Sequence, residues 1–166
     1  MMRLIFCIAF IVFIILQNVV HELGHVIFAK YLEIKVRKIQ WFTASKLGGS
    51  KVCYENEPEI DEDVIEKKWG IAALGGFLAT LSVGYILTVI YYIFRNLNSP
   101  IYVIIICAGS MVFLISDLVY FILGCIFRFG DIVGVMKVFK IGRLTALFVL
   151  VVMLIININI IKFLWY

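Results

Sequence analysis

Four long apolar segments account for most of this chain and limit the folds that are open to it. They cover about residues 4–31, 69–94, 101–127 and 144–164, and each reaches the ~20 residues that a helix needs to cross a bilayer core. Because the bilayer core offers no water to backbone N–H and C=O groups, a helix is the expected form of each segment. The sequence therefore predicts an all-α membrane protein with about four transmembrane helices.

The overall composition supports a membrane protein and argues against a soluble one. The chain is 64% hydrophobic and only 16% charged, whereas soluble domains are nearer half apolar and a quarter charged. We interpret residues 1–166 as a single integral-membrane domain. The net charge of +4 is modest, and we attribute it to membrane topology rather than to nucleic-acid binding.

The basic residues predict how the spans are oriented. Eight lysines and arginines lie in segment 30–69 and four in segment 128–143, whereas only Arg3, Arg95 and Lys162 fall on the opposite side. Cytoplasmic loops carry an excess of basic residues. We therefore expect both large loops to be cytoplasmic and both termini to be external, in a protein of the cell membrane.

The segment between the first two spans is the only sizeable polar stretch. Partial alternation in "EIKVRKIQWF", the turn-like "KLGGS" and the following "KVCY" predict a small cytoplasmic β-hairpin over residues 36–54. The acidic run "ENEPEIDEDVIEKK" is interpreted as a solvated linker. Segment 128–143 is expected to be a loop.

The first apolar segment contains the motif "HELGH", which is the main indication of chemistry in this chain. His21 and His25 are four residues apart, so a helix places them on one face, and this spacing suits two ligands of one zinc ion. Glu22 lies beside them and could act as a general base towards water. If the span ends near Tyr31, His25 and His21 lie about 9 and 15 Å below the cytoplasmic surface. Hydrolysis there requires a cavity that opens to the cytoplasmic side.

A catalytic zinc usually takes three protein ligands, and the chain has no third histidine. Apart from Glu22 and the acids of the first polar loop, the candidates are Asp117 and Asp131. Asp131 follows Gly130 at the cytoplasmic end of the third span, and Asp117 lies deeper, roughly level with His21. The residues alone do not separate these two candidates.

With these segments in place, the chain resembles the site-2 proteases, a family of intramembrane zinc metalloproteases. "HELGH" matches the zinc motif of that family, "KIQWFTASKLGGSKVCYE" resembles its β-containing segment, and "AALGGFLAT" takes the place of its small-residue motif. "SDLVYFILGCIFRFGDIVGV" holds the position of the family's third core span. The resemblance covers about residues 4–137, which leaves the span at 144–164 as an addition to the core.

The resemblance implies a zinc ion (Zn²⁺) held by His21, His25 and Asp131, with Glu22 as the catalytic base. The chain departs from the family in two places: it has no Asn-Pro pair before Asp131, and Ile132 replaces the usual glycine. The family's asparagine helps to position the substrate. Asp117 is the polar side chain in a comparable place and is expected to line the site.

The expected function is hydrolysis of a peptide bond in or near a transmembrane segment of a membrane protein or membrane-bound peptide. An edge of the hairpin at 36–54 could hold the unwound substrate as an added strand, with Gly48 and Gly49 in its turn as candidates for lining the substrate site. Gly75 and Gly76 are expected to serve close helix packing. Two alternatives remain: a catalytically inactive pseudoprotease with a binding or regulatory role, and a metal transporter.

Overall fold

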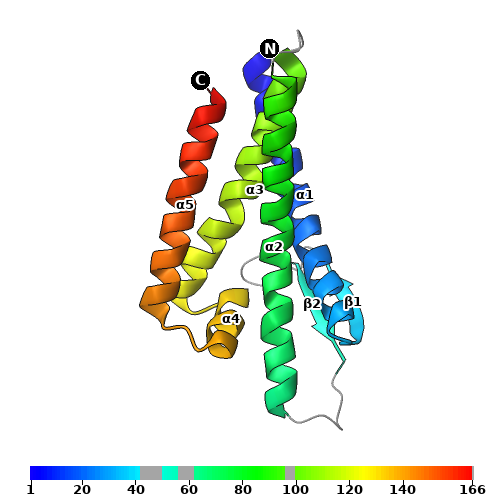
Figure 1. Cartoon of the computed structure of the whole chain (residues 1–166). Helices are drawn as coiled ribbons and strands as arrows, with labels where there is room; N and C mark the ends of the chain where they lie inside the picture. Colours follow the sequence, from blue (N-terminus) through cyan, green and yellow to red (C-terminus); the bar gives the residue numbers. More distant parts are fainter. Residues whose placement is uncertain (42–49, 56–61, 96–99, 166) are drawn as a thin grey trace.

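The structure is a computed structural model that describes residues 1–41, 50–55, 62–95 and 100–165 (Figure 1). The described residues form five helices and one two-stranded sheet, in the order α1 (Met2–Tyr31), β1 (Val36–Gln40), β2 (Lys51–Tyr54), α2 (Glu62–Phe94), α3 (Pro100–Phe127), α4 (Asp131–Phe139) and α5 (Arg143–Trp165). This arrangement confirms the predicted all-α membrane architecture with a small hairpin between the first two spans.

Four of the described helices, α1, α2, α3 and α5, are long and apolar enough to cross a membrane. Many of their large apolar side chains point outwards, as Ile8, Ile86 and Phe148 do, with exposed fractions of 55%, 57% and 69%. Such outward apolar faces are expected where lipid rather than water surrounds a helix. The length and the exposed apolar surface of these helices are therefore compatible with a membrane protein.

Helices α1, α2 and α3 pack against one another, and α5 packs mainly on α3 (Figure 1). The N-terminal end of α1 and the C-terminal end of α5 lie at the same end of the bundle, whereas the hairpin and α4 lie towards the opposite end. The predicted topology requires both chain ends on one side of the membrane. The assignment of that side to the cell exterior stays a prediction.

The apolar core lies between α2, α3, α4 and α5. The rings of Phe77 and Phe121 stack with their centroids 4.6 Å apart and join α2 to α3. Asn157 of α5 is fully buried, donates to the carbonyl of Leu114 at 2.9 Å and accepts from the hydroxyl of Tyr85 at 2.9 Å. These two hydrogen bonds attach the additional C-terminal span to the other helices.

Two glycines allow α1 and α2 to approach closely. A Cβ atom on Gly24 would lie 2.3 Å from the carbonyl oxygen of Gly75, and a Cβ atom on Gly75 would lie 2.6 Å from the carbonyl oxygen of Gly24. Contacts this short leave no room for a side chain at either position. The close packing predicted for Gly75 is thus confirmed, and it brings α2 directly against the face of α1 that carries the histidines.

The hairpin is antiparallel, with Ile39 opposite Val52 and Gln40 opposite Lys51. The pairing is irregular between Val36 and Lys38, where β1 carries an extra residue. The predicted turn residues Gly48 and Gly49 lie outside the described part of the chain.

The structure corrects the sequence interpretation in two places. Helix α2 begins at Glu62, so the last part of the predicted acidic linker belongs to a helix. Acidic residues such as Asp63 suit the first turn of a helix, where they face the positive end of its dipole. Segment 128–143 was expected to be a loop, but it contains α4, whose buried residues Ile132 and Val135 pack into the core.

Candidate metal centre

The two histidines of the chain lie on one face of α1, where α2 and α3 pack against it. His21 and His25 are buried, with exposed fractions of 8% and 5%, and their ring centroids are 4.7 Å apart. A Cβ atom on Gly76 of α2 would lie 2.7 Å from Nε2 of His21 and 2.8 Å from Cε1 of His25. The absence of a side chain at Gly76 therefore makes room for both imidazole rings.

Asp131 reaches these histidines from the first turn of α4. Gly130, just before it, has φ +71° and ψ −167°, a conformation that is essentially restricted to glycine. A Cβ atom on Gly130 would also lie 2.3 Å from the hydroxyl oxygen of Tyr120. The bend at Gly130 ends the α3–α4 connection and starts α4 so that the carboxylate of Asp131 points towards α1.

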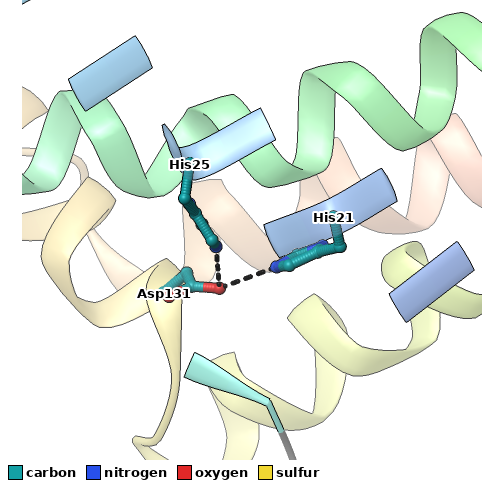
Figure 2. Close-up of side chains that lie close together, drawn as sticks. All are labelled: His21, His25 and Asp131. Atoms are coloured by element: carbon teal, nitrogen blue, oxygen red, sulfur yellow. Dashed lines mark hydrogen bonds and ion pairs between the residues drawn. The ribbon is translucent and has the colours of Figure 1, made fainter. Parts of the chain in front are cut away.

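Figure 2 shows that one carboxylate oxygen of Asp131 lies between the two imidazole rings. Its Oδ2 atom is 3.1 Å from Nε2 of His21 and 3.4 Å from Nε2 of His25. One potential ligand atom from each of the three residues lies within 4.8 Å of the other two.

The donor set and its spacing fit a metal ion. A tetrahedral zinc ion with bonds of about 2.0–2.1 Å holds its ligand atoms about 3.4 Å apart. The two distances to Asp131 are close to this value, and imidazole nitrogen and carboxylate oxygen are both common zinc ligands. His21, His25 and Asp131 could therefore hold a metal ion.

Hydrogen bonds at the far side of each ring orient both histidines. Nδ1 of His25 lies 2.8 Å from the carbonyl oxygen of Ala72, which can only accept, so this nitrogen carries the proton. Nδ1 of His21 lies 2.8 Å from Oδ2 of Asp117. In both residues Nε2 is then the nitrogen that faces Asp131, and it can bind a metal ion once it is unprotonated. Ligating histidines commonly have such outer partners.

Glu22 has one carboxylate oxygen without a partner. The residue is only 5% exposed, and its Oε2 atom forms no hydrogen bond with any described residue. Burial of an unbonded carboxylate oxygen is costly, and such groups are uncommon in folded proteins. The Glu22 carboxylate therefore has hydrogen-bonding capacity that no described residue uses.

Glu22 and the three possible ligands line a cavity of about 410 Å³. The cavity is large enough for several water molecules and has many polar groups on its wall. Strand β2 forms part of this wall with Lys51, Val52 and Tyr54. The complete lining is Gln17, Asn18, His21, Glu22, His25, Ser50, Lys51, Val52, Tyr54, Trp69, Ala73, Ser116, Asp117, Tyr120, Gly130 and Asp131.

The charges around the cavity shift the pKa values of two groups outside the spans. Burial on its own would raise the pKa of Asp131, but hydrogen bonds and charge interactions with His21 and His25 outweigh burial and hold the pKa of this carboxyl well below its ordinary value. Burial, together with the charges of Asp131 and Glu22, raises the pKa of Tyr54. Asp131 is thus an anion and Tyr54 a neutral phenol at neutral pH.

The structure brings His21, Glu22, His25, Asp117 and Asp131 together around one cavity. Asp131 faces Nε2 of both histidines, whereas Asp117 bonds to Nδ1 of His21 and so lies behind the ring. Gly48 and Gly49, the candidates in the hairpin turn, fall outside the described residues.

Three further polar residues near the site were not singled out from the sequence. Gln17 precedes His21 by four residues, so helical periodicity could have placed it on the same face of α1. Thr80 of α2 donates a hydrogen bond to Asp117. The ring of Tyr120 in α3 lies nearly perpendicular to that of His21, with the centroids 6.3 Å apart. No spacing in the sequence links these residues of α2 and α3 to the "HELGH" motif.

Comparison of the chain with protein-family models, curated proteins and solved structures found no match.

Proposed function

We propose that this protein is an intramembrane zinc metallopeptidase, which hydrolyses a peptide bond in or near a transmembrane segment of a membrane protein or membrane-bound peptide. One observation carries the proposal: Glu22, whose Oε2 atom forms no hydrogen bond with any described residue, lines the same cavity as the His21, His25 and Asp131 group. A site that only stores a metal needs no such carboxylate, whereas a hydrolytic site needs a base next to its metal.

The three ligands support zinc in a catalytic rather than a structural site. Two histidines and one carboxylate leave the fourth position of a tetrahedral ion open, as catalytic zinc sites do. When bound, zinc polarises the scissile carbonyl group and lowers the pKa of water towards neutrality. His21 and His25 present Nε2 to the site because their Nδ1 atoms are bonded elsewhere, and each Nε2 would release its proton when an ion binds.

Glu22 carries the proton transfers in this mechanism. Its carboxylate takes a proton from the attacking water while the water oxygen bonds to the scissile carbonyl carbon. The same carboxyl group then gives the proton to the amide nitrogen as the C–N bond breaks, which releases a carboxylic acid and an amine. The free Oε2 atom supports this role, since no described group competes for the proton.

The substrate has to present an extended backbone, because the carbonyl groups of an intact helix are already hydrogen-bonded. Strand β2 supports capture of such a segment. Its residues Lys51, Val52 and Tyr54 line the cavity, and the described sheet has only two strands. A substrate strand added to β2 would run past the metal centre, with its backbone bonded to the hairpin.

Zinc content and peptide cleavage test the proposal together. The chain, purified and placed in lipid nanodiscs, is assayed for zinc by mass spectrometry and for cleavage of a set of single-span peptides with a fluorophore and a quencher. We expect about one zinc per chain and cleavage by the wild type. Glu22→Gln should retain the zinc and lose cleavage, because the ligands survive while the base does not. Cleavage by Glu22→Gln at the wild-type rate would overturn the assigned role.

Other outcomes identify the alternatives. Zinc binding without cleavage of any peptide would indicate a pseudoprotease with a binding or regulatory role. Zinc uptake into sealed vesicles that contain the protein would indicate a transporter. His21→Ala and His25→Ala serve as the matched metal-free controls, because each removes one ligand and should abolish both zinc binding and cleavage.

A further inference from the structure

A second carboxylate lies behind His21, on the side of the ring away from Asp131. Asp117 of α3 is buried, with an exposed fraction of 3%, and its Oδ2 atom accepts the Nδ1 proton of His21 at 2.8 Å. A carboxylate at this depth in an apolar bundle is costly unless it is fully hydrogen-bonded or balances a positive charge. Its position therefore requires an explanation beyond helix packing.

Two other helices supply the remaining hydrogen bonds of this carboxylate. The side-chain amide of Gln17 in α1 donates to Oδ1 of Asp117, and the hydroxyl group of Thr80 in α2 donates to Oδ2. Both donors are buried, at 6% and 0% exposure. Amide and hydroxyl protons from α1 and α2 thus point at Asp117, and Oδ2 is the acceptor that faces Nδ1 of His21.

We propose that Asp117 is a positioning residue for the metal centre. It holds the proton of His21 on Nδ1, so that Nε2 faces the metal as a neutral donor, and it adds negative charge next to a site that binds a cation. This inference rests on the zinc site proposed above and adds an outer residue to its three ligands.

The charges of the centre support this role. A divalent ion with two neutral imidazoles and the Asp131 carboxylate keeps one positive charge, which is costly in a low-dielectric interior. Asp117 supplies one negative charge through direct contact with a ligand ring.

The two histidines differ in this respect. The outer partner of His25 is the uncharged carbonyl oxygen of Ala72, whereas the outer partner of His21 is an anion. A carboxylate raises the basicity of a ligating imidazole more than a carbonyl does. His21 should therefore be the stronger of the two nitrogen ligands.

Metal affinity in variants of Asp117 tests the inference separately from proteolysis. The metal-free chain in nanodiscs is titrated with Zn²⁺ against a competing chelator, and with Co²⁺, whose visible spectrum reports the ligand geometry. We expect Asp117→Asn to weaken Zn²⁺ binding 10–100-fold and to shift the Co²⁺ bands, because loss of an outer-shell partner has this effect. Ser110→Ala is the matched control, since Ser110 is a fully buried residue of α3 that donates only to the carbonyl of Ile106.

The thermal unfolding of the metal-free proteins separates positioning from folding. Asp117→Asn keeps the shape of the side chain, so its metal-free unfolding temperature should stay near that of Ser110→Ala. If the amide disturbs folding, the double variant Gln17→Leu with Asp117→Leu removes the carboxylate together with its amide donor, so that only Nδ1 of His21 loses its partner. It should show the same loss of Zn²⁺ affinity.

The possible failures are distinguishable. Wild-type Zn²⁺ affinity in Asp117→Asn, or in the folded double variant, overturns the positioning role and leaves the proposed peptidase intact. Loss of Zn²⁺ in Asp117→Asn as complete as in Asp131→Asn would make Asp117 a direct ligand and also overturn the inference. Absence of Zn²⁺ binding in the wild type removes the proposed function and the inference together.

Discussion

Nε2 of His21 lies 3.1 Å from Oδ2 of Asp131, a residue 110 positions further along the chain. The first residue belongs to a long span, and the second to a short helix that follows the third span. The possible metal ligands thus come from two elements that meet only in the folded bundle. Packing of α4 is as important for the centre as the "HELGH" motif itself.

Replacement of the two aspartates should have unequal effects on zinc content. Asp131→Asn exchanges an anionic ligand for a poor neutral one and removes the negative charge in direct contact with the metal, so we expect zinc and activity to be lost. Asp117→Asn should retain zinc at high metal concentration, with reduced affinity and part of the activity. Metal analysis of both purified variants at the same zinc concentrations decides this. Retention of zinc by Asp131→Asn and its loss from Asp117→Asn would reverse the assignment.

Gly130→Ala should weaken the metal centre without unfolding the bundle. A Cβ atom at position 130 would meet the hydroxyl of Tyr120 and would impose a backbone conformation that alanine rarely adopts. We expect a cost of about 1–3 kcal/mol, partly relieved by displacement of Asp131 from the histidines. Gly142→Ala is the control, since the nearest atom to its added Cβ, Oγ1 of Thr145, lies 3.8 Å away. Equal zinc affinity in the two variants would contradict the expected link between the bend and the site.

Backbone methylation of a cleaved peptide should reveal whether the substrate pairs with β2. N-methyl groups at alternate amides next to the scissile bond remove N–H donors but keep the side chains. Each lost hydrogen bond is worth about 0.5–1.5 kcal/mol, so kcat/KM should fall roughly 2–10-fold for each N–H that faces the strand. Methylation at the remaining alternate positions provides the control. An equal response at all positions would argue against an added strand.

Cysteine labelling from each side of sealed cells should report the predicted topology. On a background without the four native cysteines, Lys38→Cys and Lys137→Cys should react only with a reagent that crosses the membrane. Arg95→Cys, near the opposite end of the bundle, should react with an impermeant reagent. All three side chains are exposed in the structure, so access depends on the membrane alone. Impermeant labelling at position 38 or 137 would reverse the predicted orientation.

The parts of the fold that the sequence predicts correctly depend on simple physical requirements. The length of an apolar run sets a span, and the alternation around Ile39 and Val52 gives the hairpin. Helix α4 was not predicted because it is short, and its two buried residues acquire an apolar environment only when α2 and α3 are already assembled. The start of α2 at Glu62 was not predicted, because the first residues of this helix are highly charged and resemble a solvated linker.

In the candidate site, too, features within one helix were predictable and contacts between helices were not. Helical periodicity alone placed His21 and His25 on one face, because both lie on one helix. The outer partner of His21 was not predictable in this way, since Gln17, Thr80 and Asp117 belong to three different helices and no single segment contains their relationship. For the same reason the sequence alone left the third ligand open between Asp117 and Asp131, because only contacts between different helices distinguish the two residues.

The position of Asp131 on α4 has a consequence for how the chain holds together. The exposed ion pair between Lys137 and Glu66 links α4 to α2 but contributes little in water. An ion bound by α1 and α4 would instead cross-link these two helices. At a free concentration 100-fold above its Kd, the ion would add about 2.7 kcal/mol to the stability of the folded state. The attachment of α4 to α1 would then depend on the concentration of zinc around the protein. At low zinc, the site would lose its ion and α4 would at the same time be held less firmly against α1.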